Sequence, residues 1–397
     1  MTAFCQSLPN IRVVQSVPGV FHHFDLAREL YAQANLTRIY STFPWSRLKR
    51  EGLPRSIVGT FPLIGPALML CARYGLSLPR PVLNQLDQAH AVTFDRWVAA
   101  HLPPCDAFVG LSSFGLLTGR TAQSRGGVYV CDRGSAHVRF QRNLLAEEFH
   151  RWGVPFEACA SWSIAREELE YEQADAITVP SEFVRRSFVQ MGVPAERVHK
   201  IPYGVNLQKF HPVGAPPAES FEVLFVGQVG FRKGVPYLLQ AFERLSHPRK
   251  RLRIVGVVKD EIRPYLAKHL PRNVEIVGAV PQAELKAIMS TSHVMVLPSL
   301  EEGLALVQGQ AMACGCPLIA STNTGGTELF TDGVEGFEAP IRSADAIAER
   351  LQQLADDPHL QRQMSHAALE RVKQLGGWST YGEQYTCLLR ELIAKRS

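Results

Sequence analysis

Short runs of apolar and β-branched residues alternate with longer amphipathic stretches along the chain. The apolar runs cover residues 11–17, 106–112, 127–132, 175–180, 222–227, 252–257, 274–280, 293–299 and 317–322. Between them, stretches such as FDLARELYAQ place apolar residues at helical spacing. Continuous apolar strands that alternate with helices are typical of parallel sheets, which are buried on both faces. The pattern therefore predicts an α/β protein.

The alternation is interrupted near residue 201 by IPYGVNLQKFHPVGAPPAES, which is rich in Pro and Gly and predicts a linker. We expect one Rossmann-like domain over residues 1–205 and a second over 206–376. An amphipathic segment over 377–397 should form a helix that crosses back to the first domain. Ligands of doubly wound sheets bind beyond the carboxyl ends of the strands, so the chemistry should lie in a cleft between the domains.

Composition narrows the class of protein. Hydrophobic residues make up 46% of the chain and charged residues 20%, as in globular proteins with sizeable cores. The net charge of +5 is too small for a nucleic-acid packager, so no nucleic-acid partner is expected. The eight cysteines include no Cys-x-x-Cys pair, which argues against a zinc ribbon.

The amino terminus MTAFCQSLPN has neither a basic start nor a long apolar run, so we expect a cytoplasmic protein without a secretory signal. Residues 57–70 form the most apolar stretch, which is too short for a membrane span of about 20 residues. Arg47, Lys49, Arg50 and Arg55 precede it. This order fits peripheral contact with an anionic membrane. It fits equally a solvated helix end followed by a core-facing segment.

Two motifs follow strands in the second half. In QVGFRKG, Arg232 and Lys233 stand just before a helix start at Gly234. Backbone N–H groups, a helix dipole and cationic side chains would converge there on a diphosphate; the alternative is a solvated turn. In LEEGLALVQGQAMACGCP, Glu302 ends a strand and a helix of small residues follows, which brings the helix N-terminus close to a ligand.

Taken in order, four blocks resemble the retaining glycosyltransferases of family 4, which have the GT-B fold. The blocks are IPYGVNLQKFHP, FVGQVGFRKGVPYLLQAF, LPSLEEGLALVQGQAMACGCPLIAS and TGGTELFTDGVEGF. The resemblance covers nearly the whole second half and continues more weakly through PGVFHHFDLAREL and DAITVPSEFVRRSF. It implies two Rossmann-like domains that face each other across a cleft.

The activity implied by this resemblance is transfer of a sugar from a nucleotide-sugar donor, with retention at the anomeric carbon. The acceptor would be a saccharide or a lipid-linked molecule in polysaccharide or glycolipid biosynthesis. No cofactor or metal is expected, and no Asp-x-Asp stands after a predicted strand to suggest one. The leaving diphosphate would itself accept the proton of the acceptor, a step that depends on positioning.

The resemblance assigns the donor site mainly to the second half. Glu302 would orient the donor sugar, while Lys233 and Arg232 would meet the charge of the diphosphate. The other donor-binding residues implied are Gly19, Ala279, Val280, Gly303, Leu304, Ala305, Leu306 and Gln310. Gly19 would face the phosphates and Ala279 and Val280 the base, although an ordinary strand-end turn is the alternative for the last two.

Two positions depart from the family pattern and suggest a subgroup. Gln310 replaces the second Glu of the Glu-x7-Glu signature, and Gln228 stands where Arg is common. Gln310 can still bind the ribose hydroxyls, with a contact weaker by about 1 kcal/mol. The alternatives to an active transferase are a non-catalytic binding or regulatory subunit, motivated by these changes, and another GT-B enzyme such as an epimerase. The intact Glu302 and Lys233 favour the transferase.

The acceptor site is expected in the first half, where CDRGSAHVRF follows the strand GVYV. Many family members have His at about the place of Asp132, which could orient or deprotonate an acceptor hydroxyl. Arg133 and His137 would contact the acceptor; the alternative is a helix cap at Asp132 and a surface cation at Arg133. Because adjacent histidines are expected to point different ways, we expect His22 to face the acceptor and His23 to be structural.

Overall fold

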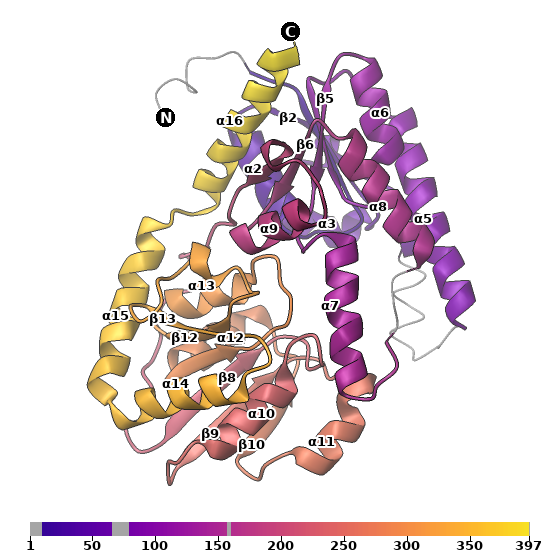
Figure 1. Ribbon diagram of the computed structural model, residues 1–397. Coiled ribbons are helices and arrows are strands. Elements are labelled where there is room, and N and C mark those ends of the chain that lie inside the picture. The colour runs from indigo at the N-terminus through magenta and orange to yellow at the C-terminus, as the bar shows by residue number, and fades with distance from the viewer. Residues whose placement is uncertain (1–9, 66–78, 157–159, 397) are drawn as a thin grey trace.

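The computed structural model describes residues 10–65, 79–156 and 160–396, which form two parallel sheets (Figure 1). Within these ranges the first sheet has the order β3-β2-β1-β4-β5-β6-β7 and the second the order β10-β9-β8-β11-β12-β13. The strands are β1 (Val13–Val17), β2 (Leu36–Ser41), β3 (Val58–Thr60), β4 (Ala107–Leu111), β5 (Val128–Asp132), β6 (Ala176–Val179), β7 (Val198–Lys200), β8 (Phe221–Val226), β9 (Lys250–Val255), β10 (Val274–Gly278), β11 (Val294–Leu297), β12 (Leu318–Ser321) and β13 (Gly336–Ala339). Both sheets reverse their order beside their first strand, so each is doubly wound like a Rossmann domain.

Helices cover both faces of each sheet. They are α2 (His23–Ala32), α3 (Trp45–Leu48), α5 (Arg80–Ala100), α6 (Leu116–Ser124), α7 (Val138–Arg151), α8 (Ser161–Gln173), α9 (Glu182–Gln190), α10 (Val235–Arg244), α11 (Arg263–His269), α12 (Gln282–Ser290), α13 (Leu306–Ala313), α14 (Ala344–Asp356), α15 (Pro358–Gln374) and α16 (Trp378–Arg396). In the first domain α2 and α16 share a core with one face of the sheet, and α5, α6, α8 and α9 with the other. Among the described residues, no helix is both long and apolar enough to cross a membrane.

Each of the nine predicted strands is present, with ends that shift by a few residues. The central ones form because their side chains are mostly apolar on both faces: every residue of β5 and β8 is buried, for example. The predicted apolar segment 57–70 contains β3, in which Val58 is fully buried, whereas Leu63 is 64% exposed. Residues 66–70 of that segment lie outside the described residues.

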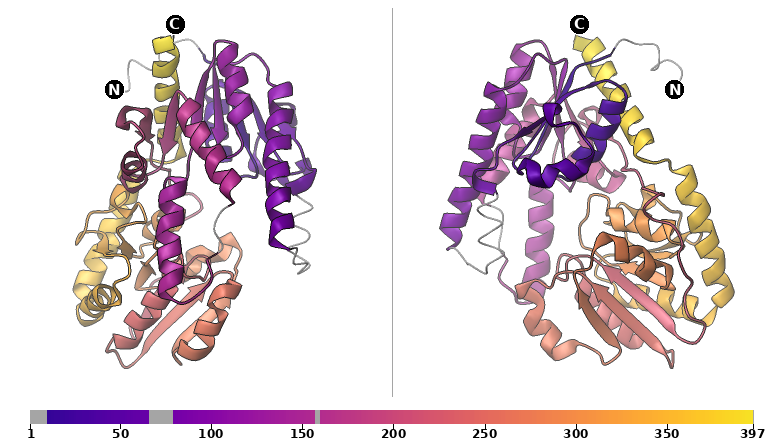
Figure 2. Two further views of the ribbon diagram at one scale, coloured as in Figure 1. Left: turned by 45° about the vertical axis from the view of Figure 1, so that its right-hand side comes forward. Right: turned by 180° about the vertical axis from the view of Figure 1, so that it is seen from behind.

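The chain passes between the domains twice. The first passage follows β7, and the second separates α15, on the second domain, from α16, on the first (Figures 1 and 2). Tyr385 and Leu389 of α16 are fully buried in the core that also holds β1 and α2. The passages touch, because a methyl group added to Gly204 would lie 2.4 Å from the carbonyl carbon of Gly377.

The end of α7 forms a third contact between the domains (Figure 2). Glu148 is fully buried and accepts hydrogen bonds from Trp152 Nε1 (2.7 Å), Tyr237 hydroxyl (2.8 Å) and Arg342 Nε (2.6 Å). The Trp152 ring also packs on Phe231, with ring centroids 5.7 Å apart. The helix that starts beside the predicted acceptor site therefore ends against the loop that carries Arg232.

Candidate active site

The loop between β8 and α10 brings Arg232 and Lys233 to the carboxyl edge of the second sheet, beside its point of reversal. Gly234 caps α10 with φ of +66°, a conformation that favours glycine. A methyl group there would also lie 2.0 Å from the carbonyl oxygen of Pro298. The sequence Arg-Lys-Gly thus turns tightly against the end of β11 and holds both cations beside the next motif.

Glu302 lies opposite these cations in the loop after β11. The residue is only 8% exposed, and its carboxylate forms an ion pair with Lys233 and approaches Arg232 NH2 at 3.5 Å. Burial lowers the pKa of Arg232, but the carboxylates of Glu302 and Glu301 raise it above its ordinary value. The structure therefore brings together the three charged residues predicted for the donor, with the cations neutralised by carboxylates.

The residue after Glu302 lies against the first domain. A methyl group added to Gly303 would lie 1.8 Å from the carbonyl oxygen of Gly134, so the two backbones are in direct contact. Ser181 Oγ of the first domain donates a hydrogen bond to the Gly303 carbonyl oxygen (2.5 Å). Because Gly134 follows β5 and Ser181 follows β6, the carboxyl edges of the two sheets face each other here.

A cavity of about 490 Å³ lies between the domains. Its lining includes Val20, Asp25, Arg28, Arg50 and Glu51 of the first domain, Gly204, Val205, Asn206, Lys209 and Phe210 of the linker, and Gln282, Leu306, Gln310 and Trp378. Gln310 and Leu306, predicted for the donor, therefore share one cavity with Val20, the neighbour of Gly19. Ala279 and Val280 do not themselves line this cavity but lie three and two positions before the lining residue Gln282, while Gln228 is exposed.

Leu304, Ala305 and Leu306, which the resemblance assigns to donor binding, lie at the start of α13. This helix begins at Leu306 with Ala305 at its cap, and no side chain caps it. The Ala305 N–H donates to the Thr324 carbonyl oxygen at 3.4 Å, and Leu304 is buried. Gly19 is buried at the end of β1, where Ser41 Oγ donates to its carbonyl oxygen (2.7 Å).

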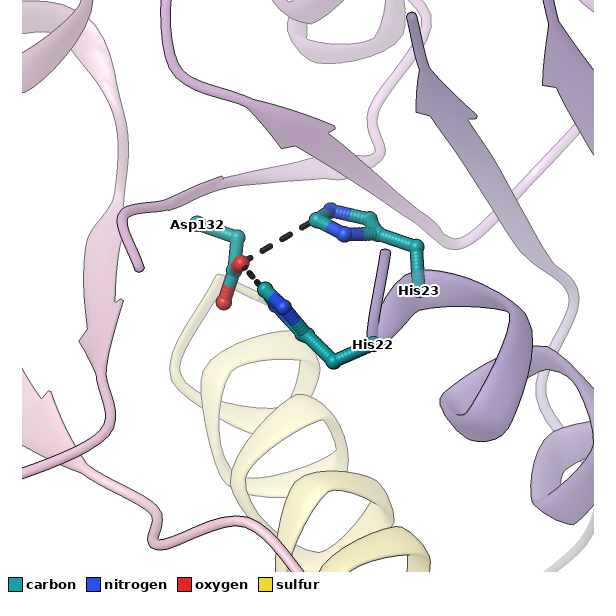
Figure 3. A group of neighbouring side chains, drawn as sticks. All are labelled: His22, His23 and Asp132. Carbon is teal, nitrogen blue, oxygen red and sulfur yellow. Dashed lines mark hydrogen bonds and ion pairs between the residues drawn. The ribbon is translucent and has the colours of Figure 1, made fainter. Parts of the chain in front are cut away.

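The acceptor side is centred on Asp132 and His22, which come from β5 and the start of α2 (Figure 3). Asp132 is 4% exposed, and both carboxylate oxygens are engaged: Oδ2 with His22 Nε2 at 2.6 Å and Oδ1 with Thr178 Oγ1 at 2.7 Å. Burial raises the pKa of Asp132, but the charge and hydrogen bond of His22 outweigh burial and lower it to about 2. The carboxylate is thus a poor proton acceptor near neutral pH.

His23 points toward the same carboxylate, with Nε2 3.7 Å from Asp132 Oδ2 (Figure 3). It is 1% exposed, and burial, followed by the charge of His22, lowers its pKa to about 3. The ligand atoms of His22, His23 and Asp132 all lie within 4.8 Å of one another, so this set could hold a metal ion. His22 also packs on Tyr203, with ring centroids 4.4 Å apart.

Arg133 and His137, predicted to contact the acceptor, have internal partners. Arg133 forms an ion pair of 2.8 Å with Glu167, which is 5% exposed. His137 caps α7: its Nδ1 accepts from the Arg139 N–H at 3.2 Å. Burial is the main cause that lowers the pKa of His137 to about 4. Arg133 is therefore not the surface cation weighed as an alternative, and the cap of α7 is His137 rather than Asp132.

Glu301 is the charged residue of this region that sequence patterns did not single out. It is fully buried beside Arg232, with NH1 2.8 Å from Oε2. The pair Glu301-Glu302 was visible in the sequence, but the resemblance assigns a role to Glu302 alone. The signal in the sequence was that Arg232 and Lys233 carry two positive charges, whereas Glu302 alone supplies one negative charge. A second carboxylate beside Glu302 could therefore have been expected to pair with one of them.

Two Rossmann-like domains whose carboxyl edges face each other define the GT-B class of fold. Residues 22–209 match the family model described as Glycosyltransferase Family 4, and residues 208–371 match the one described as Glycosyl transferases group 1. Together these models cover most of the sequence, and the chain belongs to the GT-B glycosyltransferases.

Relatives and solved structures agree with this family. The chain is 29% identical over 215 residues to an alpha-D-kanosaminyltransferase of Streptomyces kanamyceticus, covering 50% of this chain and 56% of that protein. It is 23% identical to a putative colanic acid biosynthesis glycosyltransferase of Salmonella typhimurium, covering 90% and 86%. The match thus spans little more than half of the first relative. A sucrose-phosphate synthase from Thermosynechococcus elongatus has the same fold (TM-score 0.73, 23% identity, 97% and 100% covered), as has Anabaena HepE, solved with UDP and glucose (TM-score 0.67, 15% identity, 96% and 100% covered).

Proposed function

We propose that the chain is an active glycosyltransferase that moves a sugar from a nucleotide-sugar donor to a saccharide or lipid-linked acceptor in polysaccharide or glycolipid biosynthesis. The observation that carries the proposal is the meeting of Lys233, Arg232 and Glu302 opposite His22 and Asp132, across the contact of the two sheet edges. The donor class is supported by HepE, whose structure contains UDP and glucose. The glycan product is supported by the colanic acid relative.

In the proposed reaction the second domain handles the donor. Lys233 pairs with Glu302 before the donor binds, and the diphosphate would take over this ammonium group together with Arg232. These cations would then stabilise the charge that develops on the leaving diphosphate. Glu302, released from Lys233, would orient the hydroxyls of the donor sugar. Gln310 and the cavity beside it would hold the ribose.

The first domain handles the acceptor. Because both oxygens of Asp132 are engaged and its pKa is about 2, we assign it the orientation of His22 rather than proton transfer. Among the described residues, His22 contacts Asp132 and Tyr203 through Nε2, and we assign its Nδ1 to an acceptor hydroxyl. The leaving diphosphate would accept the proton in a transfer that retains the anomeric configuration. NMR of the product would test retention, and a product of inverted configuration would refute it.

We propose that the reaction needs no metal. The charges that a metal would neutralise in a donor diphosphate are met by Lys233 and Arg232. Turnover should therefore be unchanged in EDTA. Loss of turnover in EDTA, with recovery on adding a divalent cation, would overturn this part of the proposal and direct attention to His22, His23 and Asp132.

A thermal-shift screen against UDP-, GDP-, ADP- and dTDP-sugars tests the donor assignment. We expect one nucleotide class to raise the melting temperature, since a ligand that binds only the folded state stabilises it. The second candidate function is a non-catalytic subunit, favoured by the exposed Gln228 and by Gln310. Stabilisation by a nucleotide sugar without release of its diphosphate, even with cell-extracted acceptors, would support that candidate.

We also propose that the protein is cytoplasmic and touches the anionic inner face of the membrane, where lipid-linked acceptors would lie. The contact would use the segment from Arg47 to Arg55. There Arg47 lies over the Phe43 ring (3.9 Å to its centroid) and Arg55 over the Trp45 ring (5.4 Å). Co-sedimentation with vesicles containing anionic lipid, but not with neutral vesicles, is the expected result. Equal co-sedimentation of the protein with anionic and with neutral vesicles would refute the proposed contact with an anionic membrane.

A further inference from the structure

Glu301 joins the two domains at the centre of the candidate active site. Its fully buried carboxylate accepts three hydrogen bonds. Oε1 accepts from the Ala136 N–H at 2.9 Å, and Oε2 accepts from Gln141 Nε2 at 2.6 Å and from Arg232 NH1 at 2.8 Å. Two donors belong to the acceptor side of the first domain and the third to the donor loop of the second. One side chain thus links a cation proposed for the diphosphate to the loop after β5.

The network continues on both sides of this link. Arg232 NH2 also approaches Glu302 at 3.5 Å. Gln141 receives a hydrogen bond on Oε1 from Arg133 NH2 at 3.3 Å, so both ends of its amide are used. Arg133 directly follows Asp132 in the chain. A displacement of Glu301 would therefore be transmitted to charged residues on the donor side and to the loop that carries the acceptor residues.

We propose that Glu301 is a positioning residue that fixes Arg232 and the loop of residues 134–136 relative to each other, so that donor and acceptor meet in one geometry. This inference rests on the proposed glycosyl transfer. Because Glu301 is fully buried and enclosed by its own three donors, we assign it no contact with either substrate. Its negative charge opposes a diphosphate beside Arg232, so it contributes to geometry and not to donor affinity.

The variant Glu301→Gln separates an effect on the position of Arg232 and residues 134–136 from an effect on affinity for the nucleoside diphosphate. Its amide oxygen can still accept from Ala136, but its NH2 group would face Gln141 and Arg232, which are themselves donors. Turnover should fall at least tenfold. Affinity for the nucleoside diphosphate should stay unchanged or become up to threefold tighter, because a negative charge near the diphosphate is lost. Loss of a direct ligand, or unfolding, would instead lower turnover and affinity together.

Glu148→Gln is the matched control. Glu148 is also fully buried, bridges the two domains and accepts three hydrogen bonds, but none of them comes from Arg232. We expect Glu148→Gln to lower the melting temperature about as much as Glu301→Gln does. Its turnover should stay within threefold of wild type. Gln141→Leu is a second variant, which removes one of the three hydrogen bonds to Glu301 and the link from Glu301 to Arg133 without changing charge. It should reproduce the loss of turnover with unchanged affinity, even where Glu301→Gln fails to fold.

The experiment compares the full-length proteins in three measurements. These are release of nucleoside diphosphate from the nucleotide sugar that the wild type uses, affinity for that diphosphate by calorimetry, and melting temperature. Lower turnover with retained affinity in Glu301→Gln, or in Gln141→Leu, and not in Glu148→Gln, supports the proposal. The proposal is overturned if the turnover of the Glu301 and Gln141 variants stays within threefold of wild type. It is also overturned if turnover and affinity for the diphosphate fall together in these variants, or if Glu148→Gln loses as much turnover as they do.

The wild type itself separates this inference from the proposed function. No release by the wild type from any UDP-, GDP-, ADP- or dTDP-sugar, with cell-extracted acceptors present, would defeat the proposed function and this inference with it. An active wild type alongside equally active Glu301 and Gln141 variants would defeat the role of Glu301 alone.

Discussion

The substitution Asp132→Asn should lower the stability of the first domain by an amount that depends on pH. In the folded protein the pKa of Asp132 falls from its ordinary 3.8 to about 2, because the charge and hydrogen bond of His22 outweigh burial. Since one pKa unit corresponds to about 1.4 kcal/mol, the charged carboxylate contributes about 2 to 3 kcal/mol to the free energy of unfolding near neutral pH. Asparagine cannot carry this charge. Its amide oxygen can still accept the hydrogen bond from Thr178 Oγ1, but this bond is weaker than the one to a carboxylate.

The pH range of this effect follows from the two pKa values. Because the folded-state pKa is lower, the contribution is fully present above about pH 4 and is lost as the pH falls toward 2. The difference in unfolding free energy between wild type and Asp132→Asn should therefore shrink as the pH falls below about 4. Turnover of the variant should fall as well, since His22 loses the partner that orients it.

Urea-induced unfolding, followed by circular dichroism at several pH values, provides the measurement. Asp345→Asn is the control, because Asp345 is 90% exposed and its ion pair with Arg244 should contribute less than about 1 kcal/mol. Equal stability of wild type and Asp132→Asn at pH 7 would refute the reasoning. A difference that widens on acidification would refute it too, because the sign would be opposite.

Three further predictions concern the donor side. Lys233→Ala should lower turnover at least a hundredfold with an unchanged melting temperature, as expected for loss of a preorganised charge; turnover within threefold of wild type would remove Lys233 from the site. Gln310→Glu should tighten donor binding about fivefold, by about 1 kcal/mol for a charged hydrogen bond, with a smaller change in turnover; calorimetry that shows no change in affinity would contradict the ribose role. Gly303→Ala should lower both melting temperature and turnover, because the added methyl would lie 1.8 Å from Gly134 O; a fully stable, active variant would show that this contact is not needed.

Much of the fold could be predicted from the sequence because the central strands are apolar on both faces. The strands that were not predicted lie at or near the sheet edges: β3, β7 and β13 have only three or four residues, and β2 carries the polar Thr37 and Arg38. Their short or mixed patterns resemble loops. They are strands because a neighbouring strand offers them hydrogen-bonding partners, which no local pattern encodes.

The meeting of two predicted side chains could be inferred from the sequence where their motifs follow neighbouring strands. Lys233 and Glu302 come from two motifs that follow strands, and the parallel sheet brings those strand ends to one edge. Side chains whose partners come from distant elements were not predictable. The ion pair of Arg133 with Glu167 and the engagement of both Asp132 oxygens depend on how α8, β6 and α2 pack. Glu301 was missed for the same reason, since its partners lie across the domain contact.

We propose that Lys233 and Glu302 form the donor site of a nucleotide-sugar-dependent transferase. The most direct test is release of nucleoside diphosphate from UDP-, GDP-, ADP- and dTDP-sugars by the wild type and by Lys233→Ala, with cell-extracted acceptors present. We expect the wild type to release the diphosphate from one nucleotide class, and Lys233→Ala to release at least a hundredfold less. No release from any donor, or equal release by both proteins, would contradict it.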